Sequence, residues 1–84
     1  MWRAEIKVLL KPSILDPQGQ ATEKALAAMG YAEVDQVRVG KYLEVTFSAP
    51  DRTAAEAKVE ELCSRLLVNT VIEDYTYNLV EVAP

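Results

Sequence analysis

Residues 2–17, WRAEIKVLLKPSILDP, decide how the fold begins. Every second side chain from Trp2 to Leu10 is apolar, and most of the side chains between them are charged. Alternation of this kind predicts a β-strand with one face on the core and the other face in solvent. Leu9 breaks the pattern on the polar face, where it is either a scattered surface leucine or a contact to another subunit.

The second half of this stretch predicts a change from strand to helix. Pro12 should end the strand, because it lacks the N–H group that the ladder of a sheet needs. Asp16 followed by Pro17 is typical of a helix N-cap with proline at the first helical position. We expect a helix from about Pro17 to Met29, with Gly30 directly after its end. Its apolar side chains form a modest stripe, which consists of Ala21, Ala25, Leu26 and Met29.

Residues 34–48 are strand-like throughout, with Gly40 near the middle of the segment. A two-residue turn at Gly40 would place Val37 on the opposite face from the apolar residues that follow. A three-residue loop or a bulge around Gly40 keeps one core face, and we prefer it for that reason. The residues that Val37 then joins are Leu43, Val45 and Phe47. The sequence leaves open whether this segment is one bent strand or two short strands.

A second helix is predicted over residues 50–67, PDRTAAEAKVEELCSRLL. Thr53 and Glu56 have the spacing of a capping box. The apolar stripe of this helix consists of Val59, Leu62, Cys63 and Leu66. We interpret Cys63 as a core residue, because it lies on that stripe and the chain has no histidine to activate it. Asn69 should end the helix, and residues 71–82 then form a last strand with apolar side chains on both faces.

The order of these elements is β-α-β(β)-α-β, which indicates an α+β fold related to the ferredoxin-like plait. We expect an antiparallel sheet of three to four strands, with both helices on one of its faces. The 84 residues form one domain, residues 1–84. A domain this small has marginal stability, and its single cysteine allows no internal disulfide. Self-association, through the apolar faces of the last strand, is therefore the expected reinforcement.

Composition excludes several classes of function. A chain without histidine and with one cysteine offers no common zinc or copper site and no serine or cysteine triad. The net charge of −4, with acidic and basic residues interleaved, argues against a nucleic-acid partner. Glu5 and Lys7 interrupt the first apolar run, so we expect neither a signal peptide nor a membrane span, and we expect a cytoplasmic protein. No glycine-rich phosphate loop occurs, and the adjacent carboxylates of Glu73 and Asp74 point to opposite faces of a strand.

The loop after the first strand is stiffer than a surface turn requires. Its two prolines restrict the backbone, and Gly19 in the first helical turn indicates either a close backbone approach or a tolerated surface glycine. Ile14 and Leu15 are either tucked against the edge of the core or presented to another chain. We interpret residues 11–19 as a loop that contacts a partner, held still in advance of binding.

Three stretches together resemble the PurS family, the small subunit of phosphoribosylformylglycinamidine synthase. They are LKPSILDPQG at residues 10–19, VRVGKY at residues 37–42 and VIEDY at residues 71–75. The resemblance runs essentially from end to end, although the family's NP before VIEDY is Asn69-Thr70 here, which makes that corner less rigid. By position in these motifs, the resemblance implies contact or motif roles for Lys11, Pro12, Asp16, Pro17, Gly19, Arg38, Gly40, Lys41, Tyr42, Ile72, Glu73, Asp74 and Tyr75. Ile14 and Leu15 join these candidates from the argument about the loop.

The resemblance implies a role in purine biosynthesis. The synthase converts formylglycinamide ribonucleotide, glutamine and ATP to formylglycinamidine ribonucleotide, glutamate, ADP and phosphate. In the family, a large synthetase subunit uses ATP and magnesium, and a separate glutaminase subunit releases ammonia. The small subunit forms a homodimer or higher homo-oligomer, bridges the other two and assists ammonia transfer. The resemblance thus implies no catalytic, cofactor or metal residue in this chain.

The alternative is a regulatory amino-acid-binding module of the ACT type. Such a module has a similar order of elements and dimerises through its sheets. It usually has a glycine in the loop after its first strand, whereas that loop is stiffened by prolines here.

Overall fold

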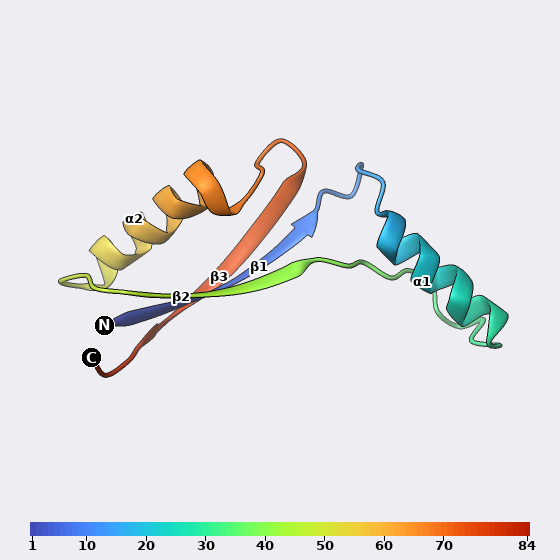
Figure 1. The fold of residues 1–84 in the computed structure, drawn as a ribbon, viewed down its shortest axis with the longest axis horizontal. Helices are drawn as coiled ribbons and strands as arrows, with labels where there is room; N and C mark the ends of the chain where they lie inside the picture. Colours follow the sequence, from blue (N-terminus) through green and yellow to red (C-terminus); the bar gives the residue numbers. More distant parts are fainter.

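A computed structural model describes all residues from Met1 to Pro84 and shows one antiparallel sheet with two helices (Figure 1). The elements in chain order are β1 (Trp2–Leu10), α1 (Pro17–Ala28), β2 (Lys41–Phe47), α2 (Arg52–Leu62), a π-helical turn η1 (Cys63–Leu67) and β3 (Glu73–Glu81). The strands lie in the order β2-β1-β3, with both pairs antiparallel. The predicted α+β class and the antiparallel sheet are confirmed, and the sheet has three strands.

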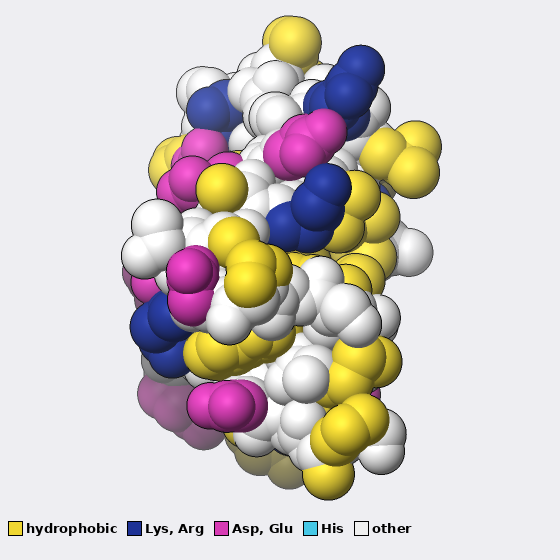
Figure 2. Space-filling model, turned by 90° about the vertical axis from the view of Figure 1, so that its left-hand side faces the viewer, with side chains coloured by type: hydrophobic (Ala, Val, Ile, Leu, Met, Phe, Trp, Pro, Cys, Tyr) yellow, Lys and Arg dark blue, Asp and Glu magenta, His cyan; other side chains and the backbone are white.

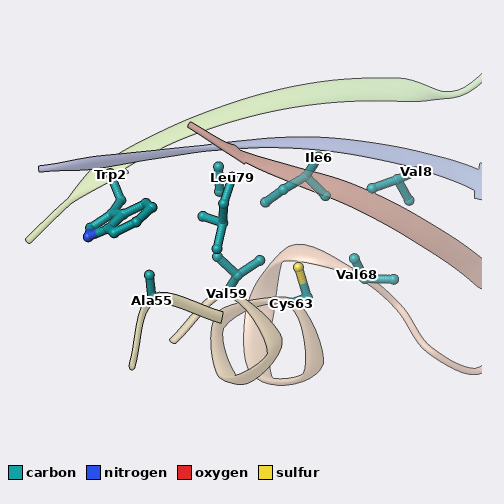
Figure 3. Close-up of a cluster of buried hydrophobic side chains, with 9 residues drawn as sticks. Trp2, Ile6, Val8, Ala55, Val59, Cys63, Val68 and Leu79 are labelled. Atoms are coloured by element: carbon teal, nitrogen blue, oxygen red, sulfur yellow. The ribbon is translucent and has the colours of Figure 1, made fainter. Parts of the chain in front are cut away.

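The alternation in β1 produces the core, as predicted. Trp2, Ala4, Ile6 and Val8 are buried, and Ile6 lies between Leu43 of β2 and Tyr77 of β3 in the register of the sheet. Figure 3 shows this face of the sheet above α2 and η1. The other buried side chains are Ala55 and Val59 of α2, Cys63 of η1, Val68 after it and Leu79 of β3. The interpretation of Cys63 as a core residue is confirmed.

Helix α2 begins differently from the prediction. Its N-cap is Asp51, whose backbone is extended and whose carboxylate accepts the N–H of Ala54 at 2.8 Å. The capping box predicted at Thr53 is wrong, because Thr53 already lies inside the helix. The preceding aspartate offers an acceptor to the free N–H groups one position before the helix starts, and aspartate is among the strongest N-cap residues.

The last turn of the helix is wider than an α-helical turn. The N–H of Val68 donates to the carbonyl of Cys63 at 3.0 Å, five residues back along the chain. This spacing defines a π-helical turn, which rotates the following side chains about the helix axis. The prediction that Leu66 faces the core is therefore wrong: Leu66 is 81% exposed, and Leu67 packs against the core instead.

The middle of the chain forms one strand and no hairpin. Of residues 34–48, only Lys41–Phe47 pairs with β1, and the prediction of a loop or bulge that keeps Val37 on the sheet is wrong. The strand-like residues before Lys41 have no place in the sheet, because the β1–β2 register ends at the pair Val8–Lys41. Strand propensity is local, whereas a strand exists only where a partner is within reach.

Helix α1 has the predicted ends, but it does not cover the sheet. It spans Pro17–Ala28, and Gly30 follows with φ 93°, a conformation that suits glycine after a helix. Figure 1 shows α1 beyond the end of the sheet, while α2 alone lies over a sheet face, so the prediction of two helices on one face is wrong. The protein is elongated as a result, with extents of 51 × 28 × 14 Å.

Candidate functional site

Asp16 is the centre of the candidate site, at the point where the loop after β1 enters α1. One carboxylate oxygen accepts the N–H of Gly19 at 3.0 Å, which caps the helix as predicted. The other oxygen accepts the N–H of Val39 at 2.9 Å, from a segment that lies 23 residues away in the sequence. These backbone N–H groups, Val39 first, and the nearby charge of Arg38 hold the pKa of Asp16 below its ordinary value. Asp16 therefore both starts the helix and fixes the chain segment that leads into β2.

Two further side chains hold the same segment. The guanidinium of Arg38 donates to the carbonyl of Leu10 at the end of β1. The carboxylate of Glu23, on α1, accepts the N–H of Val37 at 3.2 Å. We call Asp16, Glu23 and Arg38 the latch, because together they tie residues 37–39 to β1, to the loop and to α1.

Gly19 allows the first turn of α1 to lie against the segment of residues 37–39. It is buried, and a Cβ atom at this position would collide with the carbonyl oxygen of Val37 and lie 2.5 Å from a carboxylate oxygen of Asp16. The interpretation of Gly19 as a glycine of close approach is confirmed. Gly40 has a similar role, since a Cβ there would collide with the carbonyl oxygen of Val8.

The loop and the latch enclose an open cavity of about 340 Å³. Its walls are the loop from Leu10 to Asp16, the side chains of Gln20 and Glu23, and residues 36–38. Of the two apolar residues in the loop, Ile14 is half-buried, while Leu15 is 63% exposed. The sequence allowed this pair either to pack against the edge of the core or to be exposed. In the structure, Ile14 is partly covered and Leu15 faces solvent.

The motif at residues 71–75 lies beside the motif at residues 10–19, at the same end of the sheet. The N–H of Lys11 donates to the carbonyl of Ile72 at 2.8 Å, and its ammonium lies 2.9 Å from the carboxylate of Asp74. Lys41 lies 4.0 Å from Glu73. All of these side chains except Glu73 are well exposed to solvent, so the pairs fix register more than they add stability. Pro12, exposed, completes this end of the protein.

Two tyrosines of the motifs lie on opposite faces of the sheet. Tyr75 packs against the core and stacks near Tyr77, with 6.4 Å between ring centroids. Tyr42 is exposed on the other face, and its hydroxyl donates to Glu44 at 2.8 Å, which raises the pKa of Tyr42. The structure thus brings residues of all three motifs to one end of the sheet and leaves Tyr42 outside this group.

The chemistry of the site favours a binding surface. Its charged groups are already engaged with backbone groups or with each other, and no group of three or more His, Cys, Asp or Glu side chains could hold a metal ion. On the face in Figure 2, acidic, basic and apolar side chains are intermixed. None of the helices is long and apolar enough to cross a membrane. Sequence reasoning missed Glu23, and no local pattern indicates it, because its partner Val37 lies 14 residues away.

Comparison with known proteins identifies similar chains. The family model described as "PurS: Phosphoribosylformylglycinamidine (FGAM) synthase" matches residues 3–81. The phosphoribosylformylglycinamidine synthase subunit PurS of Bacillus subtilis is 50% identical over 82 residues, which are 98% of this chain and 96% of that protein.

Solved structures agree. A crystal structure of Bacillus subtilis PurS superposes with a TM-score of 0.85 at 49% identity, over 96% of this chain and 100% of that one. A chain in the structure of PurLQS from Thermotoga maritima has a TM-score of 0.85 at 28% identity, over 94% of this chain and 96% of that one.

Proposed function

The chain belongs to the PurS family of phosphoribosylformylglycinamidine synthase subunits, and from this premise we propose that it bridges the glutaminase and synthetase subunits of that enzyme. The synthase is a glutamine-dependent ligase of purine biosynthesis. In the proposal, the chain also assists the transfer of ammonia between the two subunits. Catalytic groups, ATP and magnesium belong to its partners, and the chain itself forms a homodimer or higher homo-oligomer.

The observation that carries the bridging role is the latched loop of residues 11–19. Ordering a flexible surface on binding costs about 0.5–1.5 kcal/mol for each immobilised side chain. Here Pro12, Pro17 and the latch order the loop in the absence of a partner. The exposed Leu15 lies between the two prolines in the sequence. A chain that must join two enzymes gains affinity from a contact surface that needs no rearrangement.

The Thermotoga maritima relative supports the choice of partners. Its structure is that of PurLQS, which places that PurS protein together with PurL and PurQ. We extend this assembly to the corresponding subunits of the present chain. The ACT-type alternative does not account for the family match over residues 3–81.

Sedimentation velocity of the two partner subunits from the same source, with and without this chain, tests the bridge. The proposal predicts a species that contains all three proteins only when the chain is present. Two partners that associate equally well in its absence would contradict the proposal.

A matched pair of substitutions locates the contact. Leu15→Ser should weaken the three-protein species by about tenfold or more, as expected for an anchoring apolar side chain in an interface. Leu66→Ser removes a leucine in η1 that is 81% exposed, against 63% for Leu15, and should leave assembly unchanged. Equal effects of the two substitutions would contradict a contact at the loop.

A further inference from the structure

The sheet has a second face, which is turned away from α2 (Figure 3), and α1 does not cover it because α1 lies beyond the end of the sheet (Figure 1). We call it the outward face. It consists of Arg3, Glu5, Lys7 and Leu9 of β1 and of the residues that pair with them on β2 and β3, because directly paired residues share a face. An antiparallel sheet can leave one face in water, so exposure alone indicates no partner.

Lys7 lies at the centre of the outward face, and its ammonium group forms no ion pair. Three carboxylates are its neighbours in the register of the sheet, but each of them is engaged with another group. The engaged pairs are Glu5 with Nε of Arg3 at 3.2 Å, Glu44 with the hydroxyl of Tyr42 at 2.8 Å, and Asp74 with Nζ of Lys11 at 2.9 Å. The chain therefore leaves one positive charge without a partner on this face.

The next row of the sheet carries the opposite charge. Glu5 and Glu44 are directly paired across β1 and β2, and like charges in this arrangement repel each other. A cation placed over the two carboxylates would relieve that repulsion. This acidic row lies two residues from Lys7 along β1, which is about 6.8 Å in an antiparallel strand.

The surface around Lys7 is hollowed. Its side chain borders three open hollows of about 210, 300 and 340 Å³. Leu9 borders two of these hollows, and Tyr42, which is 53% exposed, also borders two. Apolar surface therefore lies next to the unpaired ammonium group, and Leu9 belongs to a surface that can receive the side chains of another protein.

These features define the chemistry of an occupant. It presents an apolar side chain to Leu9, an acidic side chain to Lys7 and a basic side chain to the acidic row, in a line with steps of about 7 Å. Interfaces between permanently joined copies are rich in apolar groups, whereas the outward face is mostly charged and polar. Its composition therefore favours a different protein over a second copy of this chain.

A bridge between two subunits needs two contact surfaces. The latched loop of residues 11–19 is one of them, and the outward face has the features of a second. Only Pro12 and Arg38 border both the cavity at the loop and a hollow at Lys7. Two proteins bound at these surfaces would lie side by side at this corner, which suits the transfer of ammonia between them.

We propose that the outward face binds one of the two partner subunits of the synthase, while the latched loop binds the other. The subunit on the outward face places an acidic side chain on Lys7 and a basic side chain over Glu5 and Glu44. The proposal rests on the bridging role proposed above, and it adds the surface that holds the second subunit.

Photo-crosslinking within the assembled three-protein species tests the two surfaces. One full-length chain carries the photoreactive residue p-benzoylphenylalanine in place of Tyr42, and another carries it in place of Leu15. After illumination, mass spectrometry identifies the protein joined to each chain. The proposal predicts one partner subunit from the Tyr42 site and the other from the Leu15 site. Crosslinks from both sites to the same subunit, or crosslinks from the Tyr42 site only to a second copy or to no protein, overturn it.

Substitution of Lys7 tests the charged contact. Lys7→Gln should raise the dissociation constant of the three-protein species by about tenfold, and Lys7→Glu by about 100-fold, because glutamate also repels the acidic side chain of the partner. Lys58→Glu is the control, since it makes the same change of charge at an exposed position on α2 and should leave assembly unchanged. Sedimentation velocity measures assembly and circular dichroism confirms folding, so Lys7→Gln decides the test if Lys7→Glu does not fold.

The outcomes separate the second surface from the bridge itself. A wild-type chain that joins both subunits, with folded Lys7 variants that assemble equally well, overturns the second surface and leaves the bridge standing. Two partner subunits that associate equally well without the chain overturn the bridge and the second surface together.

Discussion

Replacing Gly19 with alanine should destabilise the protein, although alanine is the better helix residue. Helix propensity alone favours alanine over glycine by about 1 kcal/mol. The new Cβ atom, however, would overlap the carbonyl oxygen of Val37 and approach a carboxylate oxygen of Asp16 to 2.5 Å. Overpacking of this kind typically costs about 1–3 kcal/mol, and the upper end applies because a backbone carbonyl must move.

The net loss of stability from Gly19→Ala is therefore about 2 kcal/mol. For a domain of this size, 1 kcal/mol corresponds to about 4–8 °C in Tm, so we expect Tm to fall by roughly 8–16 °C. The displaced segment should also lose its bonds to the latch, so the N–H groups of Val37 and Val39 should exchange faster with solvent.

Thermal unfolding followed by circular dichroism, together with amide hydrogen exchange, measures both effects. Gln18→Ala is the control, because it places alanine in the same helical turn at an exposed position and should change Tm little. A Gly19→Ala protein at least as stable as wild type, with Val39 still protected, would refute the close approach and the latch built on it.

Three further predictions follow from the loop, from Asp16 and from the π-helical turn. Replacing Pro12 and Pro17 by alanine should weaken assembly with the partner subunits more than it lowers Tm; equal losses in a binding assay and a thermal melt would contradict preorganisation. Asp16 has a lowered pKa in the folded protein, so its stabilisation is present above pH 3.8 and is lost as the pH falls through that lowered value. Asp16→Asn should therefore reduce the rise in Tm between about pH 2 and pH 5, and an unchanged pH profile would count against the two bonds at Asp16. Leu67→Ala should destabilise the protein by about 2 kcal/mol and Leu66→Ala by less than about 0.5 kcal/mol; the reverse order in urea unfolding would contradict the π-helical turn.

Features of the fold that depend on neighbouring residues could be predicted from the sequence. The alternation in β1 fixed its buried face, and Asp16, Pro17 and Gly30 fixed both ends of α1, because caps act within one turn. The start of α2 was predicted wrongly, because the capping-box spacing of Thr53 and Glu56 indicates a later start, whereas Asp51 caps the helix.

Features that depend on distant residues could not be predicted in the same way. The extended position of α1 depends on the bonds of Arg38 to Leu10 and of Asp16 to Val39, which join segments far apart in the chain. Residues 34–40 have the composition of a strand, but they pair with no other strand in the structure.

The candidate site also contains both residues that the sequence could indicate and a residue that it could not. The prolines and Gly19 marked the loop as unusually stiff, and the resemblance pointed to Arg38 and Gly40. Glu23 carried no signal, because a glutamate on a helix surface is ordinary until the segment it holds is known.

The most direct test of the bridging role is the ligase activity of the synthetase and glutaminase subunits from the same source, measured with and without this chain. Glutamine and an ammonium salt serve in turn as the nitrogen donor. The account predicts that glutamine-dependent turnover requires the chain, while ammonium-dependent turnover by the synthetase subunit continues without it. Glutamine-dependent turnover that is equally fast in the absence of the chain would contradict the account.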